Sequence, residues 1–321
     1  VMGQEGDQLI GQVLGETYRV EKLLGGGGMG AVYEASHLRL RRRFAIKVLF
    51  PEVAANEEAL ARFQREAQIT SGLGHPHIVE VVDFNHTSDG APYIVMELLE
   101  GRDLEGLLSE EGPLPLERAA KIFGQISAAL LAAHAQGIIH RDLKPSNVYL
   151  CDKAGQRDVV KVVDFGISKV LGSKSVVTRT QATMGTPGYM SPEQAEGRAA
   201  EVDVRTDVFA MGTMLYEMLC GRTPFAGESI PTMLYKIVHQ EPPPPTGLRA
   251  DLPKPVEAVV LKALAKKPED RYQTVEALVA ALGESLGGSG AELRGSLLAA
   301  AGAVASGVKA SPGAGPAAKP A

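Results

Sequence analysis

The chain has 321 residues, a formal net charge of −5 and 45% hydrophobic residues, which suffices for a buried core in one large or two small domains. The mild acidity argues against a nucleic-acid-binding or membrane-surface protein, because such proteins carry a basic face. Two cysteines without paired spacing, Cys151 and Cys220, indicate a reducing compartment and no structural zinc. The sequence has no apolar leader and no run of about 18 apolar residues, so we expect a cytoplasmic protein without a membrane segment in this sequence.

The N-terminal part of the chain alternates between apolar and polar residues, as is typical of strands. Two such runs, residues 18–24 and 31–35, flank the glycine-rich stretch 25–30. Glycines between two strand-like runs indicate a hairpin, whereas a dinucleotide-binding fingerprint would open a helix after them. Glycine backbones can close over phosphates, so the stretch is a weak candidate for a nucleotide loop.

Residues 44–49 form a short apolar run with one lysine, Lys47, inside it. A buried lysine needs a partner, because an unpaired buried charge is costly. Asn56 can cap a following helix whose apolar residues recur every three positions, and Glu66 lies near the apolar edge of that helix. Taken alone, Glu66 is another solvated helix charge. The strand lysine before it makes a Lys47–Glu66 ion pair the competing interpretation.

Two further strand-like runs, residues 78–84 and 93–97, are expected to pair as a hairpin through Asp89-Gly90. From Leu104 onward the periodicity becomes helical. Residues 116–136 predict a long buried helix that ends at Gly137. Residues 148–150 and 159–163 predict a second hairpin, which delivers an aspartate at position 164.

The most informative stretch, H-R-D-L-K-P-S-N at residues 140–147, precedes this second hairpin. Asp142 can accept a hydroxyl proton, and Lys144 can neutralise a phosphate. Asn147 and Asp164 offer hard oxygen ligands of the kind that Mg²⁺ prefers. An isolated His-Arg-Asp is more simply a polar turn between two apolar strands. The D-F-G at residues 164–166 and the rest of the chain favour a phosphoryl-transfer site.

The second half of the chain contains one long segment of low periodicity. Residues 167–190 are rich in Ser, Thr and Lys, and loops of that length are usually functional or disordered. They end in G-T-P-G-Y-M-S-P-E at residues 185–193, and an apolar helix follows from about residue 203. The prolines at 242–245 predict a stiff spacer. After about Ser285 the chain is dominated by Ala, Gly, Ser and Pro, so we expect a linker.

In order and spacing, these motifs resemble those of the bacterial, eukaryotic-like Ser/Thr protein kinases. The resemblance covers roughly residues 18–282 and implies an α+β, bilobal protein kinase fold. An antiparallel sheet of five strands with one main helix would form an N-lobe over residues 18–97. A mostly helical C-lobe would span residues 101–282. Residues 1–17 would be an N-terminal extension, and residues 283–321 a flexible tail.

The resemblance assigns chemistry to six residues that come from both halves of the domain. Four would act in catalysis. Asp142 and Lys144 would contact the reacting groups directly. Lys47 and Glu66 would form an ion pair that orients the α- and β-phosphates. Two would bind Mg²⁺, with Mn²⁺ as an alternative: Asn147 and Asp164.

ATP would be bound by the glycine-rich stretch, the strands beside it and the connection between the lobes. The residues concerned are Leu24, Gly25, Gly26, Gly27, Gly28, Met29, Gly30, Ala31, Val32, Ala45, Lys47, Met96, Glu97, Leu99 and Tyr149. Met96 would be the gatekeeper, although it can equally be ordinary core filler. Two positions depart from the usual pattern: many relatives have a bulkier residue at Gly26 and an aliphatic residue at Tyr149.

The resemblance also suggests how substrates and regulation enter. Lys144 and Thr186, the latter in the docking segment, resemble the Ser/Thr class rather than the Tyr class. Thr178 and Thr180 would be phosphorylated in trans, which implies a homodimer during autophosphorylation, and the phosphate would be met by Arg141.

Two structural pairings are implied as well. Asp207 would hold the backbone of the catalytic loop, although an aspartate at a helix start can also be a plain cap. Arg271 would pair with Glu193.

The preferred interpretation is a kinase that transfers the γ-phosphate of ATP to Ser/Thr hydroxyls of proteins, with no nucleic-acid partner. An ATP-binding pseudokinase scaffold is the alternative, but it would be expected to lack at least one of four residues that are all present: Lys47, Asp142, Asn147 and Asp164. A small-molecule kinase of similar fold is disfavoured by residues 185–193, which look suited to docking a polypeptide.

Overall fold

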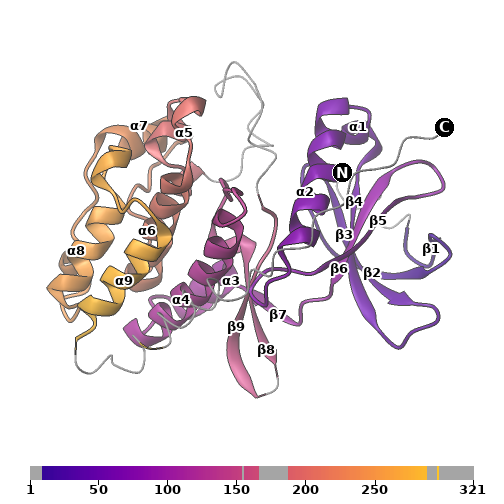
Figure 1. The fold of residues 1–321 in the computed structure, drawn as a ribbon, viewed down its shortest axis with the longest axis horizontal. Coiled ribbons are helices and arrows are strands. Elements are labelled where there is room, and N and C mark those ends of the chain that lie inside the picture. The colour runs from indigo at the N-terminus through magenta and orange to yellow at the C-terminus, as the bar shows by residue number, and fades with distance from the viewer. Residues whose placement is uncertain (1–8, 154, 166–186, 288–294, 296–321) are drawn as a thin grey trace, which may run out of the picture.

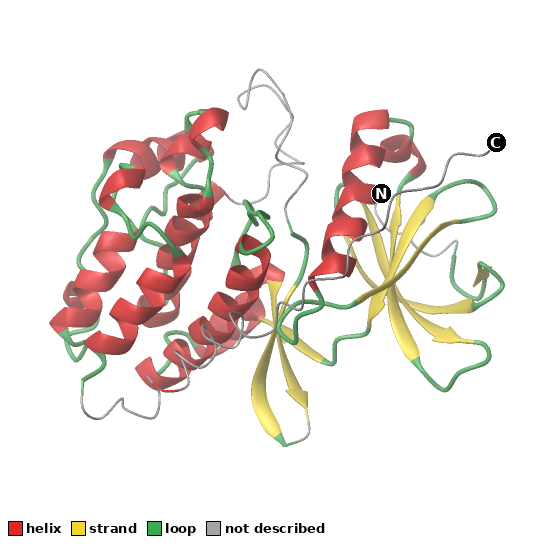
Figure 2. Ribbon diagram, viewed as in Figure 1, coloured by secondary structure: helices red, strands yellow, loops and turns green. Residues whose placement is uncertain are grey.

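The computed structural model describes residues 9–153, 155–165, 187–287 and 295. Two lobes lie side by side, one built mainly of strands and one mainly of helices (Figures 1 and 2). The bilobal α+β arrangement expected from the sequence is therefore confirmed. The predicted phosphorylation sites Thr178 and Thr180, the docking residue Thr186 and nearly all of the Ala/Gly-rich tail lie outside the described residues.

The N-lobe contains an antiparallel sheet of six strands rather than the expected five, in the order β1-β2-β3-β4-β6-β5. The strands are β1 Val13–Leu14, β2 Tyr18–Gly26, β3 Gly30–His37, β4 Arg43–Leu49, β5 Val81–His86 and β6 Pro92–Glu97. The additional strand is β1, which pairs with β2 through Val13–Arg19 and Leu14–Tyr18. It lies within the segment that we had set apart as an N-terminal extension.

Each face of this sheet has its own apolar cluster. On one face, buried residues of β2, β3, β4 and β6 pack with Leu14 of β1. On the other, Leu49 and Ile94 pack against Phe63 and Ala67 of helix α2, Glu57–Leu73. Helix α2 begins where the Asn56 side chain accepts a hydrogen bond from the Ala59 N–H at 3.1 Å, as the sequence predicted. A short helix that we did not expect, α1 Pro51–Ala54, precedes it.

The C-lobe is built from helices around one large apolar core. The helices are α3 Leu104–Glu111, α4 Leu116–His134, α5 Pro192–Ala195, α6 Val204–Cys220, α7 Ile230–His239, α8 Lys254–Ala263 and α9 Val275–Ser285. Short 3-10 turns occupy Pro145–Asn147, Pro187–Tyr189, Ala199–Glu201, Pro245–Gly247 and Pro268–Asp270. Helices α4 and α6 are buried along most of their length, so they form the centre of the C-lobe core. None of the described helices is both long and apolar enough to cross a membrane.

A small sheet connects the lobes to the catalytic loop. The predicted hairpin is present as β8 Val148–Lys153 and β9 Gln156–Val162, and a third strand, β7 Gly101–Asp103, pairs with β8. Strand β7 is not predicted from the sequence. Gly101 is required there, because a Cβ at this position would lie 2.0 Å from the carbonyl oxygen of Leu150. The close approach of backbones at Gly101 therefore links the segment after the N-lobe to the strand that follows the catalytic loop.

We expect strand β1 to contribute to the stability of the N-lobe. Leu14 is 3% exposed, whereas Ile10 in the same segment is 41% exposed. Replacing Leu14 with alanine should lower the free energy of unfolding by about 2–3 kcal/mol and the melting temperature by roughly 5 °C. The matched variant Ile10→Ala should melt within about 1 °C of wild type, because surface changes have small effects. Equal melting temperatures for the two variants would contradict the assignment of β1 to the sheet.

Candidate active site

An ion-pair triad joins the two lobes at the predicted phosphate site. Lys47 Nζ on β4 lies 3.3 Å from Glu66 Oε1 on α2 and 2.7 Å from Asp164 Oδ1, just after β9. Asp164 comes from the C-lobe and its side chain is 47% exposed, whereas those of Lys47 and Glu66 are 21% and 15% exposed. The structure thus brings together three residues that were selected from the sequence and that are up to 117 positions apart.

Charge interactions in this triad outweigh burial for two of the three groups. Burial alone would lower the pKa of Lys47, but the negative charges of Asp164 and Glu66 raise it above its ordinary value. Burial would raise the pKa of Asp164, but the Lys47 ammonium lowers it. For Glu66, burial dominates and raises the pKa to about 7, with Asp164 adding to the rise and Lys47 opposing it. The lysine therefore holds Asp164 as an anion.

The catalytic loop is anchored by one buried carboxylate. Asp207 on α6 accepts hydrogen bonds from the backbone N–H groups of His140 and Arg141, both at 2.9 Å. Its Oδ2 also lies 2.7 Å from Nε2 of His134, at the end of α4. These contacts hold Arg141 in a left-handed conformation with φ 65°, which is uncommon for a residue with a side chain. The expectation that Asp207 holds this backbone is confirmed, but its third partner, His134, was not foreseen.

The predicted catalytic and metal-binding residues of the C-lobe lie next to one another. Lys144 Nζ is 3.2 Å from Asp142 Oδ2, and Asn147 Nδ2 donates to the backbone carbonyl of Asp142 at 2.9 Å. The N–H of Val163 donates to the carbonyl of Asn147 at 2.9 Å, which fixes Asn147 beside the residue that precedes Asp164. The side-chain oxygens of Asn147 and Asp164 are hard donors, so this pair fits a divalent cation of the Mg²⁺ type.

The glycine-rich stretch forms the hairpin between β2 and β3. Gly27 donates its N–H to the carbonyl of Gly30 at 2.9 Å, and Gly25 and Gly26 pair with Val32 and Ala31. A Cβ at Gly30 would lie 2.1 Å from the carbonyl oxygen of Val48, so this glycine is required by close packing of β3 on β4. A Cβ at Gly25 or Gly27 would meet open space. Packing therefore does not require glycine at those two positions.

The remaining predicted nucleotide contacts lie on the strands below this hairpin and in the connection between the lobes. Val32 pairs with Lys47 across β3 and β4, and Ala45 pairs with the predicted gatekeeper Met96 across β4 and β6. The other predicted residues on or beside the hairpin are Leu24, Gly28, Met29 and Ala31, and those near the connection are Glu97, Leu99 and Tyr149. Tyr149, on β8, is half-buried, and burial raises its pKa.

Residues after the undescribed segment are tied firmly to the C-lobe. Arg271 donates to Glu193 at 2.8 and 2.9 Å, and both side chains are fully buried. This confirms the predicted pair. Thr206 donates to the same carboxylate at 2.8 Å, and Tyr189 donates to Glu217 at 2.6 Å. The described part of the predicted docking segment, residues 187–193, is therefore held by α6 and by Arg271.

Comparison with known proteins agrees with this geometry. A family model described as "Protein kinase domain" matches residues 18–281. The chain belongs to the protein kinase family. It is 42% identical over 281 residues to the serine/threonine-protein kinase pkn3 of Myxococcus xanthus, covering 86% of this chain and 51% of that protein. It is 43% identical over 265 residues to PknB of Mycobacterium tuberculosis, covering 81% of this chain and 41% of that protein.

Solved structures give the same result. A crystal structure of the Mycobacterium tuberculosis PknI kinase domain matches with a TM-score of 0.68 and 31% identity, covering 87% of this chain and 99% of that domain. The chain spans about half or less of the length of the curated relatives named above. Membership of the protein kinase family implies use of ATP and a divalent metal ion.

Two residues that shape the site, His134 and Lys161, are not predicted from the sequence. His134, which contacts Asp207, carries no local signal beyond its place in the last turn of α4. Lys161 on β9 is buried beside the connection between the lobes. The sequence does contain a signal for Lys161, because it is a lysine inside an apolar run, as Lys47 is, and such a lysine needs a partner.

We expect Asp207→Asn to destabilise the protein, because the amide replaces one acceptor by a donor and leaves buried N–H groups unpaired. The free energy of unfolding should fall by about 3 kcal/mol. Asp203→Asn, one turn earlier, is the matched control, because Asp203 caps the same helix and its side chain is 44% exposed. Asparagine is an equally good cap, so this control should stay within about 0.5 kcal/mol of wild type. Chemical denaturation of both variants measures the difference, and equal losses would refute the anchoring role of Asp207.

Proposed function

We propose that the protein is a serine/threonine protein kinase that transfers the γ-phosphate of ATP to Ser/Thr hydroxyls of protein substrates. The observation that carries the proposal is the convergence, where the lobes meet, of the Lys47–Glu66–Asp164 triad with the adjacent Asp142, Lys144 and Asn147. Phosphoryl transfer needs alignment and charge neutralisation more than covalent participation by the protein, and these residues supply both.

The residues of the catalytic loop have separate tasks in this mechanism. Asp142 orients the substrate hydroxyl and accepts its proton. Lys144, which lies 3.2 Å from Asp142, neutralises the transferred phosphoryl group. Lys47 binds the α- and β-phosphates, and Glu66 keeps its ammonium in place. The two lysines thus place positive charge where negative charge is present or develops during transfer.

Asn147 and Asp164 would hold the metal ion. Mg²⁺ is the proposed ion and Mn²⁺ the alternative, because both favour oxygen donors. When bound, such an ion neutralises the phosphate oxygens and orients the γ-phosphate. Lys47 and the fixed backbone of Asn147 keep the two donor side chains in position.

Nucleotide binding would use the glycine-rich hairpin over the phosphates and the backbone of residues 97–99 for the adenine. Met96 and Tyr149 would border the base from the N-lobe and C-lobe sides. The polypeptide substrate would dock on residues 185–193, including Thr186. The kinase domain proper would extend over residues 18–282, and a cytoplasmic location fits the proposed use of ATP.

The test is a phosphate-transfer assay with labelled ATP, Mg²⁺ and a generic basic protein. Asp142→Asn and Asp164→Asn should each lower turnover by about 10³-fold or more, because they remove the substrate-orienting group and a metal ligand. Lys47→Met should also remove activity, and weakened nucleotide binding should distinguish it from the other two variants. Circular dichroism confirms that each variant is folded. Wild-type turnover in a folded Asp142→Asn or Asp164→Asn variant would refute the proposed function, and an inactive wild type that binds ATP would favour the pseudokinase alternative.

Arg141 supports a further part of the proposal, control by phosphorylation. Its Nε is buried and has no hydrogen-bond partner among the described residues. Burial lowers the pKa of its guanidinium, the carboxylate of Asp207 opposes this fall, and the charge of nearby Arg65 on α2 adds to it. A phosphate supplies the dianion that such a pair of guanidinium groups would bind through charge-assisted hydrogen bonds. We propose that phosphate on Thr178 and Thr180, added in trans between two copies of the chain, fills this role.

Mass spectrometry of wild-type protein and of the inactive Asp142→Asn variant tests this regulation. Phosphate on Thr178 and Thr180 should occur in wild type only. The Thr178→Ala/Thr180→Ala variant should lose activity by about tenfold or more, because Arg141 then lacks its counter-charge. A double variant as fast as wild type, or an active enzyme without phosphate at these positions, would rule out the switch.

A further inference from the structure

A second lysine inside an apolar strand lies where the lobes meet. Lys161 is on β9, three residues before Asp164, and is buried. Its Nζ donates to the carbonyl oxygen of Ile78 at 3.1 Å and to the carboxylate of Glu97. The side chains of Lys161 and Glu97 are only 10% and 14% exposed. Removing one partner of such a buried pair leaves the other charge uncompensated, which is costly.

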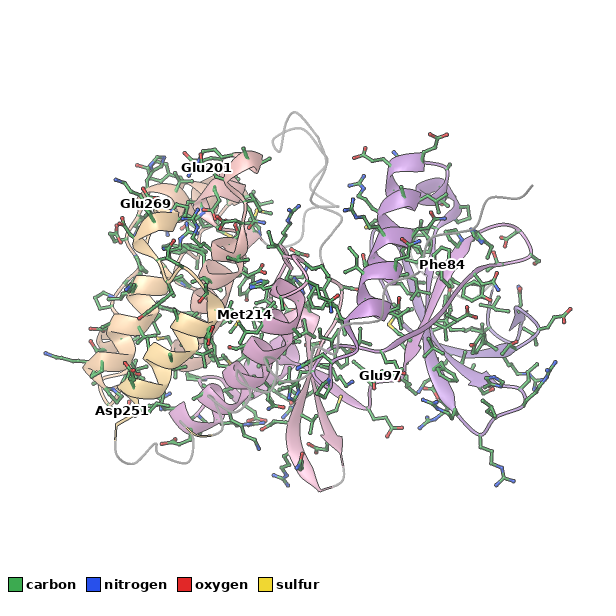
Figure 3. All side chains as sticks on the ribbon, in the orientation of Figure 1. Phe84, Glu97, Glu201, Met214, Asp251 and Glu269 are labelled. Carbon is green, nitrogen blue, oxygen red and sulfur yellow. The ribbon has the colours of Figure 1, made fainter. Side chains whose placement is uncertain are left out.

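Glu97 is held through both its backbone and its side chain. It is the last residue of β6, beside the connection to the C-lobe, as Figure 3 shows. Its backbone N–H donates to the carbonyl of Glu80 at 2.9 Å, and its carboxylate accepts from the N–H of Glu80 at 3.0 Å. Together with Lys161, these bonds fix the peptide unit at which the proposed adenine-binding segment, residues 97–99, begins.

Strand β9 is attached to the N-lobe at the same place. The N–H of Val162 donates to the carbonyl of His77 at 2.8 Å, and the N–H of Val79 donates to the carbonyl of Val162 at 3.0 Å. Residues 78 and 162 thereby form a parallel bridge. The Lys161 side chain extends this attachment to Glu97. One ammonium group therefore contacts the segment after α2 and the connection between the lobes, and it belongs to the strand that leads to Asp164.

We propose that Lys161 is a positioning residue for nucleotide binding, which rests on the proposed kinase function. It holds the connection between the lobes in the conformation that receives the adenine, and it couples that conformation to the strand that presents Asp164. A preorganised site loses less conformational freedom when the ligand binds. Without the ammonium, only a fraction of the molecules has the competent conformation, and the apparent affinity falls by that fraction.

The test variant is Lys161→Met, which keeps the length of the side chain and removes its charge. The Kd for ADP and the KM for ATP should both rise about tenfold, a typical size for coupling between two parts of a protein. The kcat should change by less than about twofold, because Lys161 contacts none of the proposed catalytic side chains. Lys161→Arg, which keeps the charge, should retain most of the nucleotide affinity.

Arg118→Met is the matched control. Arg118 on α4 forms ion pairs with Asp158, which is also on β9, at 2.8 Å and with Glu111 on α3 at 2.6 Å, and neither partner belongs to the connection between the lobes. Both variants should lower the melting temperature, because each disrupts an ion pair of β9. Only Lys161→Met should weaken nucleotide binding. The Lys161→Met/Glu97→Gln double variant should bind ADP no more weakly than the worse single variant, since both act through one pair.

The outcomes separate this inference from the function on which it rests. Normal ADP affinity in Lys161→Met, beside normal wild-type binding, would overturn the positioning role alone. Equal losses of affinity in Lys161→Met and Arg118→Met would also overturn it, because the effect would then follow from general destabilisation. A wild-type protein that binds no nucleotide would overturn the proposed function and this inference with it.

Discussion

The site depends on one lysine that contacts carboxylates from both lobes. Glu66 is delivered by the N-lobe helix α2, and Asp164 by the C-lobe strand β9, and Lys47 lies within 3.3 Å of both. Without the ammonium, the two carboxylates would repel each other, and burial would favour their neutral forms. Even with the ammonium present, burial and the charge of Asp164 raise the pKa of Glu66 to about 7. The lysine therefore fixes the position of α2 and of the predicted metal ligand at the same time.

Buried charge organises the C-lobe side of the site as well. Arg141 has a left-handed backbone, a conformation that costs on the order of 1–3 kcal/mol. The hydrogen bonds that Asp207 accepts from the N–H groups of His140 and Arg141 offset this cost. The fully buried Arg271–Glu193 pair holds the start of α5 in the same way. The hydrogen bonds of Asp207 and the Arg271–Glu193 ion pair are more directional than apolar packing. They therefore hold the loops in one conformation, where apolar contacts alone would permit several.

The sequence was sufficient for the features that rest on local patterns, and it failed where the determinant is distant or very short. The Asn56 cap of α2, the long helix α4 and the hairpins follow from periodicity and turn residues. Strands β1 and β7 have two and three residues, too few for any alternation to be visible. His134 and Lys161 acquire their roles from partners 73 and 64 positions away. Gly30 was assigned to phosphate binding, but the structure requires it first for the approach of β3 to β4.

The two strand lysines explain how the lobes are held relative to each other. The apolar clusters of the N-lobe are separate from the C-lobe core. Among the described N-lobe residues, only Leu73, Ile78 and the half-buried Ile69 pack in the C-lobe core. Apolar packing thus joins the lobes only near the end of α2. The lobes are also joined by the backbone hydrogen bonds between residues 77–79 and Val162, and by two ammonium groups. Lys47 lies at the proposed phosphate end of the site and Lys161 at the proposed adenine end. Polar contacts thus supplement a small apolar contact between the lobes. Because a nucleotide would lie between these two lysines, its binding and the orientation of the lobes depend on the same contacts.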